Sequence, residues 1–121
     1  MPIRAQQPRT RQRQMDFSKL NGLIPAVIQD VDSGDVLMVG FMNDEAWQRT
    51  LETGYATFFS RSRNTLWQKG ETSGNRLAVT EILTDCDNDS VVIKARREGN
   101  GLVCHLERRS CFVPFTVEGA R

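Results

Sequence analysis

The sequence has no long hydrophobic run, a single histidine and a small, odd number of cysteines. Without an apolar stretch of about 20 residues, a membrane-spanning helix is excluded. Three cysteines cannot pair completely, which argues against a small secreted scaffold held by disulfides. The first residues, MPIRAQQPRTRQRQ, lack the apolar region of a secretory signal. We therefore expect a cytoplasmic protein, whose cysteines act as metal ligands, catalytic groups or core residues rather than disulfides.

Acidic residues are missing from residues 1–14, which hold four arginines and two prolines. The rest of the chain carries 12 basic and 15 acidic groups, so residues 15–121 are mildly acidic although the formal net charge of the whole chain is +1. An acidic body argues against general nucleic-acid binding, which needs a basic patch. We expect a disordered basic tail over 1–14, a solvated extension in the simplest interpretation and an arm for nucleic acid or an anionic surface in the alternative.

The remaining residues, 15–121, are enough for one α+β domain of mostly antiparallel strands with one main helix. Asn43 is placed to cap a helix over about 44–53, and Gly54 is placed to end it. Apolar runs predict the strands, and the polar stretch 60–74 is predicted as a functional loop. The expected strands are 23–28, 36–41, 55–60, 77–83 and 91–95, with 102–106 and 112–117 completing the fold.

The cysteines Cys86, Cys104 and Cys111 do not have the paired spacing of a zinc ribbon. Three ligands are too few to close a structural zinc site, but a catalytic zinc keeps a fourth position for water and lowers its pKa to about 7. Three buried free cysteines explain the spacing equally well. His105 follows Cys104, and since neighbours in a strand face opposite ways, we expect it to work beside the metal rather than on it.

The run Asp85-Cys86-Asp87-Asn88-Asp89 places a carboxylate at every second position. In an extended segment, the three carboxylates share one face and Cys86 points away from them. Oxygen ligands of this kind suit Mg²⁺ or Ca²⁺. An EF-hand is excluded because its sixth and twelfth loop positions are here Ser90 and Arg96. The alternative is a solvated acidic turn.

The segment 60–75 is rich in groups that bind phosphate. Two hydroxyls alternate with two guanidiniums, which offer paired donors to phosphate oxygens. Taken alone, an ordinary polar loop explains this composition. The candidate substrate-binding residues are Ser60, Arg61, Ser62, Arg63, Lys69, Glu71, Ser73 and Asn75.

Taken together, the motifs SRSRNTLWQKGETSGN (60–75), DCDND (85–89) and CHLERRSC (104–111) resemble the signatures of the phosphoribosyl-AMP cyclohydrolases. The upstream segment 22–47 resembles them as well, and the resemblance covers about residues 16–113. There are two departures. Leu106-Glu107 stand where the family usually has Thr-Gly, and Leu77 stands where members often carry Gln. Both departures concern expected substrate contacts rather than metal ligands.

The resemblance implies hydrolysis of the N1–C6 bond of the adenine ring in phosphoribosyl-AMP, the third step of histidine biosynthesis. The product is phosphoribosylformimino-AICAR phosphate. It also implies an intertwined homodimer in which each zinc site draws cysteines from both subunits. One zinc per chain on Cys86, Cys104 and Cys111 is implied, with His105 as the proton shuttle. One Mg²⁺ per chain is implied on Asp85, Asp87 and Asp89.

Two other functions compete with this one. The first is a non-catalytic, zinc-stapled dimeric module that binds nucleotides, and the second is a nucleic-acid binder that uses the basic tail with Arg61 and Arg63. The acidic body disfavours the second. We therefore expect a small-molecule nucleotide as the partner, with neither nucleic acid nor membrane.

Overall fold

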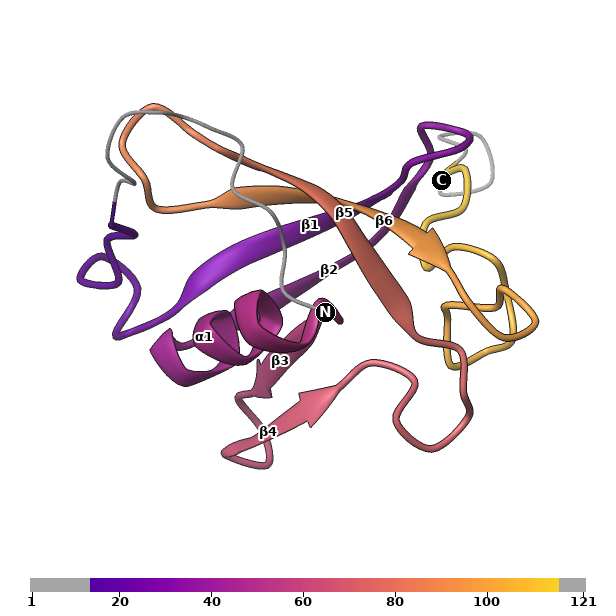
Figure 1. Ribbon diagram of the computed structural model, residues 1–121, viewed down its shortest axis with the longest axis horizontal. Helices are drawn as coiled ribbons and strands as arrows, with labels where there is room; N and C mark the ends of the chain where they lie inside the picture. The colour runs from indigo at the N-terminus through magenta and orange to yellow at the C-terminus, as the bar shows by residue number, and fades with distance from the viewer. Residues whose placement is uncertain (1–13, 116–121) are drawn as a thin grey trace.

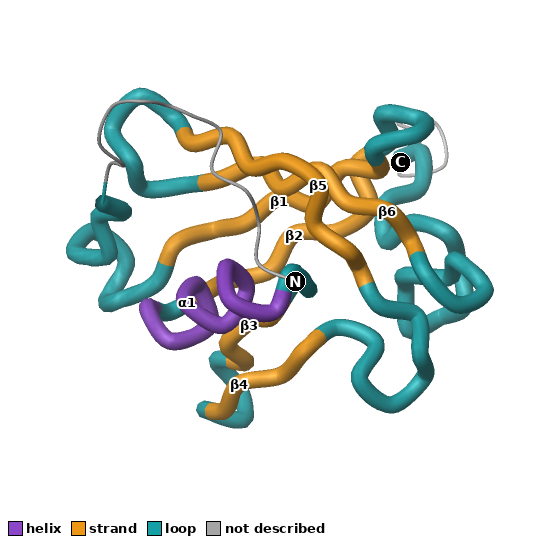
Figure 2. The backbone as a smooth tube through the Cα atoms, viewed as in Figure 1, coloured by secondary structure: helices purple, strands orange, loops and turns teal. Residues whose placement is uncertain are grey.

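The computed structural model describes residues 14–115, so the expected tail lies, except for Gln14, outside the described residues. The described chain folds into two sheets and a helix (Figures 1 and 2). In chain order the elements are β1 (Ile24–Asp30), β2 (Val36–Met42), α1 (Asp44–Thr53), β3 (Thr57–Ser60), β4 (Thr65–Gln68), β5 (Leu77–Thr84) and β6 (Val91–Arg97). The prediction of an α+β domain with mostly strands and one helix is confirmed.

The larger sheet has the strand order β2-β1-β6-β5, and the smaller sheet pairs β3 with β4. β1–β2, β5–β6 and β3–β4 are antiparallel, whereas β1 and β6 run parallel from Ala26↔Val91 to Asp30↔Ala95. Proline lacks the amide proton that a central strand needs on both sides. Pro25 is tolerated in central β1 because it precedes the parallel register.

Helix α1 begins and ends where its local sequence predicts. The Asn43 side chain accepts a hydrogen bond from the Ala46 amide at 2.8 Å, and Gly54 takes the left-handed conformation with φ 80°. On the buried face, the Thr50 hydroxyl donates to the Ala46 carbonyl at 2.9 Å and accepts from the Thr57 amide at 3.0 Å. These bonds fasten the helix to β3.

The core lies between one face of the larger sheet and the layer formed by α1 and β3 (Figure 1). Alternate residues of β1 and β6 point into it, as the period of two in a strand requires. Of the described helices, none has the length and apolarity to traverse a membrane. The fully buried apolar residues with the largest side chains are Phe58, Ile24, Ile28, Leu37, Met42, Leu77 and Ile93.

Three parts of the sequence prediction are wrong. The stretch 60–74 is not a single loop, because its Leu66 and Trp67 are half-buried and β4 pairs there with β3. The segment 102–106 is not a strand, because it folds back on itself and the amides of Val103 and Cys104 both donate to the Arg108 carbonyl at 3.0 Å. Residues 112–115 form no strand either, and 116–117 lie outside the described residues.

Candidate functional site

The acidic run lies in the turn between β5 and β6, so the arrangement considered for an extended segment does not apply to it. Asn88 adopts a left-handed conformation with φ 60°. The Asp85 carboxylate accepts hydrogen bonds from the Asp89 amide at 3.0 Å and the Ser90 hydroxyl at 2.7 Å, which curls the segment around it. The three carboxylates still converge, and one oxygen each from Asp85, Asp87 and Asp89 lie within 4.8 Å of one another.

A positively charged side chain already contacts this acidic cluster. The ammonium of Lys19 lies 2.8 Å from an oxygen of Asp87 and 3.2 Å from one of Asp89. The bond from Ser90 lowers the pKa of Asp85, whereas the neighbouring Asp85 carboxylate raises the pKa of Asp89. The bonds to Asp87 and Asp89 raise the pKa of Lys19. The cluster thus attracts positive charge, and its hard oxygens fit Mg²⁺.

Cys104 and Cys111 come together at the other end of the larger sheet. Cys104 is 7% exposed, and the Cys111 amide donates to the Leu37 carbonyl of β2 at 2.8 Å. Although Cys111 as a residue is exposed, partial burial of its thiol raises its pKa, and the neighbouring Cys104 raises it further. The positive charges of Lys69 and Arg108 act in the opposite direction. Two thiols are therefore side by side, and the nearby charges of Lys69 and Arg108 favour the thiolate of Cys111.

Cys86 does not join this pair within the chain. It is exposed in the β5–β6 turn, while Cys104 follows the far end of β6, and Figure 1 shows these two loops at opposite ends of the sheet. The seven residues of β6 span roughly 20 Å, whereas zinc–sulfur bonds of about 2.3 Å bring thiols within about 5 Å of each other. One chain thus supplies two of the three predicted zinc ligands at one place.

His105 lies in a tight turn rather than a strand, so the argument from strand alternation does not apply to it. The Glu107 amide donates to the Cys104 carbonyl at 2.8 Å, and the Leu106 amide donates to the Cys104 sulfur at 3.4 Å. Cys104 is buried by this turn while His105 remains exposed. The imidazole is therefore accessible to a substrate next to a candidate metal ligand.

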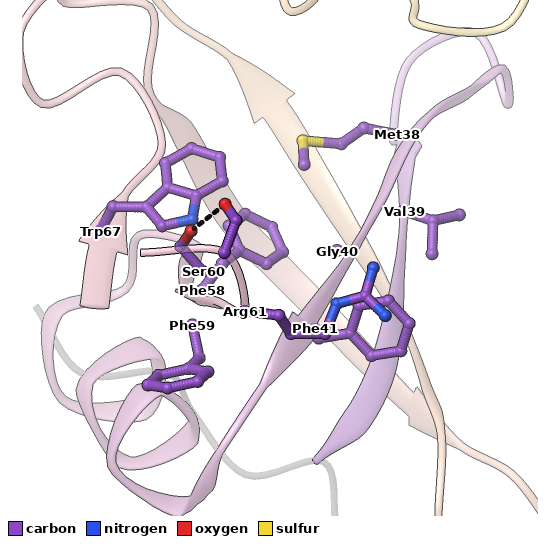
Figure 3. A pocket seen from close by; sticks show the side chains of 10 residues that line it. Met38, Val39, Gly40, Phe41, Phe58, Phe59, Ser60, Arg61 and Trp67 are labelled. Carbon is purple, nitrogen blue, oxygen red and sulfur yellow. Dashed lines mark hydrogen bonds between the residues drawn. The ribbon is translucent and has the colours of Figure 1, made fainter. Parts of the chain in front are cut away.

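The residues Ser60, Arg61, Ser62 and Arg63 form the end of β3 and the turn that leads into β4. The Ser60 hydroxyl accepts from the Arg63 amide at 3.2 Å and lies 3.4 Å from the Ser62 hydroxyl. The first three of these residues border a hollow of about 560 Å³ beside β2, shown in Figure 3. Its full lining is Met38, Val39, Gly40, Phe41, Phe58, Phe59, Ser60, Arg61, Ser62 and Trp67.

The four other candidate residues, Lys69, Glu71, Ser73 and Asn75, lie between β4 and β5 and do not line the hollow. The Glu71 carboxylate accepts from the Gln68 amide at 3.1 Å, and the Ser73 hydroxyl accepts from the Asn75 amide at 3.1 Å. The side-chain oxygen of Asn75 accepts from the Asn100 amide at 3.0 Å. These contacts hold the loop in shape, and they leave any role of Glu71, Ser73 and Asn75 in substrate binding a prediction.

Sequence reasoning missed several residues of the acidic turn and of the hollow. Nothing in the sequence pairs Lys19 with a turn 68 residues away. The aromatic residues Phe41, Phe58 and Trp67 were predicted only as strand residues or as part of a loop, although they line the hollow. The one available signal was the apolar residue that precedes the SRSR motif at 60–63. Such a residue can line a pocket or belong to the hydrophobic core, and the sequence does not distinguish the two.

The chain is similar to known proteins over most of its length. The family model described as phosphoribosyl-AMP cyclohydrolase matches residues 38–113. The phosphoribosyl-AMP cyclohydrolase of Solibacter usitatus is 60% identical over 98 residues, which cover 81% of this chain and 77% of that protein. That of Desulforapulum autotrophicum is 54% identical over 106 residues, which cover 88% of this chain and 84% of that protein. That of Pelobacter propionicus is 58% identical over 99 residues, which cover 82% of this chain and 78% of that protein.

Proposed function

This chain belongs to the phosphoribosyl-AMP cyclohydrolase family, and we propose that it hydrolyses the N1–C6 bond of the adenine ring of phosphoribosyl-AMP, the third step of histidine biosynthesis. The observation that carries the proposal is the family match over residues 38–113. That range contains the hollow, the acidic turn, the cysteine pair and His105. An enzyme that binds a nucleotide therefore accounts for every cluster of chemically active side chains in it.

The proposed reaction adds water to C6 and breaks the bond from C6 to N1. The oxygen remains on C6 as the carbonyl of a carboxamide, one proton of the water is delivered to the departing N1, and the other is released to solvent as the positive charge of the ring is lost. Ribosylation at N1 makes the ring cationic, which favours attack at C6. His105 is proposed to carry the proton, because an imidazole titrates near neutral pH and this one is exposed beside Cys104.

Cys104 and Cys111 are proposed as zinc ligands, with Cys86 of the partner subunit as the third. Adjacent thiols near Lys69 and Arg108 fit a soft metal, and the distance along β6 keeps the chain's own Cys86 away. A zinc ion held by three cysteines keeps one position for water and lowers its pKa toward neutrality. One zinc per chain and a homodimer follow from this arrangement.

Exposed apolar surface supports the homodimer. Val36 of edge strand β2 is 42% exposed, and Phe112, Val113 and Phe115 are 55%, 55% and 79% exposed. Burial of such surface between two copies stabilises an assembly by about 25 cal/mol per Å² of apolar area. The proposed intertwining would cover these residues while bringing each β5–β6 turn to the other subunit's cysteine pair.

One Mg²⁺ per chain is proposed on Asp85, Asp87 and Asp89, and the ion pairs of Lys19 with Asp87 and Asp89 support a cluster that favours positive charge. The cation would bind a phosphate of the substrate, and the residues of the 60–75 segment would bind the rest of it. We place the enzyme in the cytoplasm, because free thiols that bind metal require a reducing compartment.

An assay of ring opening tests the proposal. Full-length protein purified with zinc is mixed with phosphoribosyl-AMP in the presence of Mg²⁺, and the change in ultraviolet absorbance is recorded with and without a chelator. We expect turnover that the chelator abolishes and added zinc restores. Zinc-loaded protein that leaves phosphoribosyl-AMP intact would contradict the proposed function.

A further inference from the structure

The hollow between β2 and β3 has the character of a site for an anion. Arg61 is the only charged residue among those that line it, and none of them is acidic. The hydroxyls of Ser60 and Ser62, 3.4 Å apart, stand at the same rim. The volume of about 560 Å³ lies within the range of about 300–1,000 Å³ that is usual for small-molecule sites.

Arg61 is held by an aromatic ring rather than by a carboxylate. Its guanidinium carbon lies 4.1 Å from the centre of the Phe41 ring, and Figure 3 shows the two groups side by side. Within residues 14–115, Arg61 forms no ion pair. Four other arginines do form one with a carboxylate: Arg49, Arg76, Arg97 and Arg109.

This arrangement orients the guanidinium without using its donors. Stacking fixes the plane of the group, while its N–H groups remain along the edge to form paired bonds with an oxyanion. A carboxylate partner would both occupy these donors and repel a phosphate. Phe41 therefore restricts the rotamers of Arg61 and leaves its binding capacity intact.

The rest of the lining is aromatic and closely packed. The rings of Phe58 and Trp67 lie 5.2 Å apart with an angle of 36° between their planes. At Gly40, an added Cβ would lie 2.5 Å from the Phe58 ring, so only glycine lets β2 approach β3 this closely. Apolar walls next to a polar, cationic rim suit a sugar phosphate, which has a carbon framework and one charged end.

From this geometry we infer that the hollow is the subsite for a ribose phosphate of the substrate, and that Phe41 is the residue that positions Arg61 to bind its phosphomonoester. The inference rests on the proposed function, which supplies a substrate with two ribose 5′-phosphates. It adds a place for one of them and a residue that sequence reasoning did not identify.

The experiment measures the binding of ribose 5-phosphate to the zinc-loaded, full-length protein by calorimetry, together with kcat and KM for phosphoribosyl-AMP. Four variants are compared with the wild type: Phe41→Leu, Phe41→Trp, Arg61→Gln and Tyr55→Leu. Tyr55→Leu is the matched control, because Arg76 stacks on Tyr55 at 4.6 Å outside the hollow. Thermal unfolding confirms that each variant is folded.

We expect Arg61→Gln to abolish measurable binding of ribose 5-phosphate. Phe41→Leu should weaken it roughly three- to tenfold and raise KM by a similar factor, with kcat nearly unchanged, because the contact holds substrate and transition state alike. Phe41→Trp should restore both values, since it keeps the aromatic face, and Tyr55→Leu should leave both unchanged.

Three results would overturn the inference, and they are distinguishable. Unchanged binding of ribose 5-phosphate in Arg61→Gln would contradict the phosphate subsite. Weak binding of ribose 5-phosphate in Arg61→Gln but normal binding in Phe41→Leu would contradict the role of Phe41 in positioning Arg61. An equal loss in Tyr55→Leu would mean that stacking acts on the fold generally. Binding of ribose 5-phosphate does not depend on turnover, so a wild type that binds it but leaves phosphoribosyl-AMP intact would contradict the proposed reaction and retain the subsite.

Discussion

The guanidinium of Arg97 lies 3.2 Å from the carboxylate of Asp30, which is 1% exposed at the end of parallel strands β1 and β6. The same guanidinium donates to the Gly101 carbonyl at 3.0 Å. Asp30 also accepts from the Asp32 amide and the Ser33 hydroxyl. This pair therefore fastens the β1–β2 turn and the segment that leads to Cys104 onto the end of the sheet.

Asp30→Asn should lower the free energy of unfolding by about 1–3 kcal/mol, because it leaves a largely covered guanidinium without its countercharge. Urea unfolding at pH 7 measures the change. Glu45→Gln is the matched control, because Glu45 forms an exposed pair with Arg49 on α1 at 3.4 Å and should contribute at most about 0.5 kcal/mol. Equal losses in the two variants would contradict the special role of Asp30.

The same pair makes stability depend on pH. Burial by itself raises the pKa of Asp30, but the bonds from Asp32 and Ser33 and the charge of Arg97 outweigh it and lower the pKa below its usual value. The folded state thus binds this proton less readily than the unfolded chain, so the contribution is present above a pH of about 4 and is lost as the pH falls further. The loss on acidification should be smaller in Asp30→Asn than in the wild type.

The proposed sharing of zinc ligands between two chains predicts complementation between inactive variants. Cys86→Ser and Cys104→Ser should each lose zinc and activity as pure homodimers. In a mixed dimer, one site carries both changes and the other keeps all three cysteines, so mixing by refolding should restore activity and about one zinc per mixed dimer. Cys86→Ser mixed with itself is the control. Failure of mixing to restore any zinc would contradict sharing between subunits.

At the proposed cation site, Mg²⁺ would have to displace the ammonium of Lys19 to bind Asp87 and Asp89. Lys19→Met should therefore bind Mg²⁺, measured by calorimetry without substrate, about two- to fivefold more tightly than the wild type. Lys94→Met is the control, because Lys94 pairs with Glu81 on the neighbouring strand at 3.7 Å. Unchanged affinity in Lys19→Met would show that the ammonium does not compete, and unchanged affinity in Asp87→Asn would remove the cation site itself.

His105→Ala separates a proton shuttle from a residue that orients the Cys104 turn. As a shuttle, His105 supplies about 10²–10⁴-fold in turnover, and the variant should retain zinc and lose one limb of its pH–rate profile. A residue that only orients the turn would instead weaken zinc binding about 10–100-fold. Turnover and zinc content are measured on the same sample. Near-normal turnover after zinc is restored would exclude His105 as the acid–base residue.

Local sequence signals predicted the elements that depend on neighbours in the chain. Asn43 and Gly54 set the two ends of α1 because a cap satisfies backbone groups within a few residues. β4 was missed because its four residues lie in a polar stretch, and the strand there depends on its pairing with β3, in which Trp67 lies opposite Phe58. Segment 102–106 has strand-like composition, but the backbone bonds to Arg108 fold it into a turn.

The sequence by itself determined the helix, the class of the fold, the motifs of the family and the residue types suited to zinc, Mg²⁺ and phosphate, since each depends on short stretches of chain. Only the tertiary structure decided which of these residues meet. It joined Lys19 to Asp87, set Phe41 under Arg61 and placed Cys104 beside Cys111 but far from Cys86. Such contacts arise from strand order and register across the whole chain, and no local pattern encodes them.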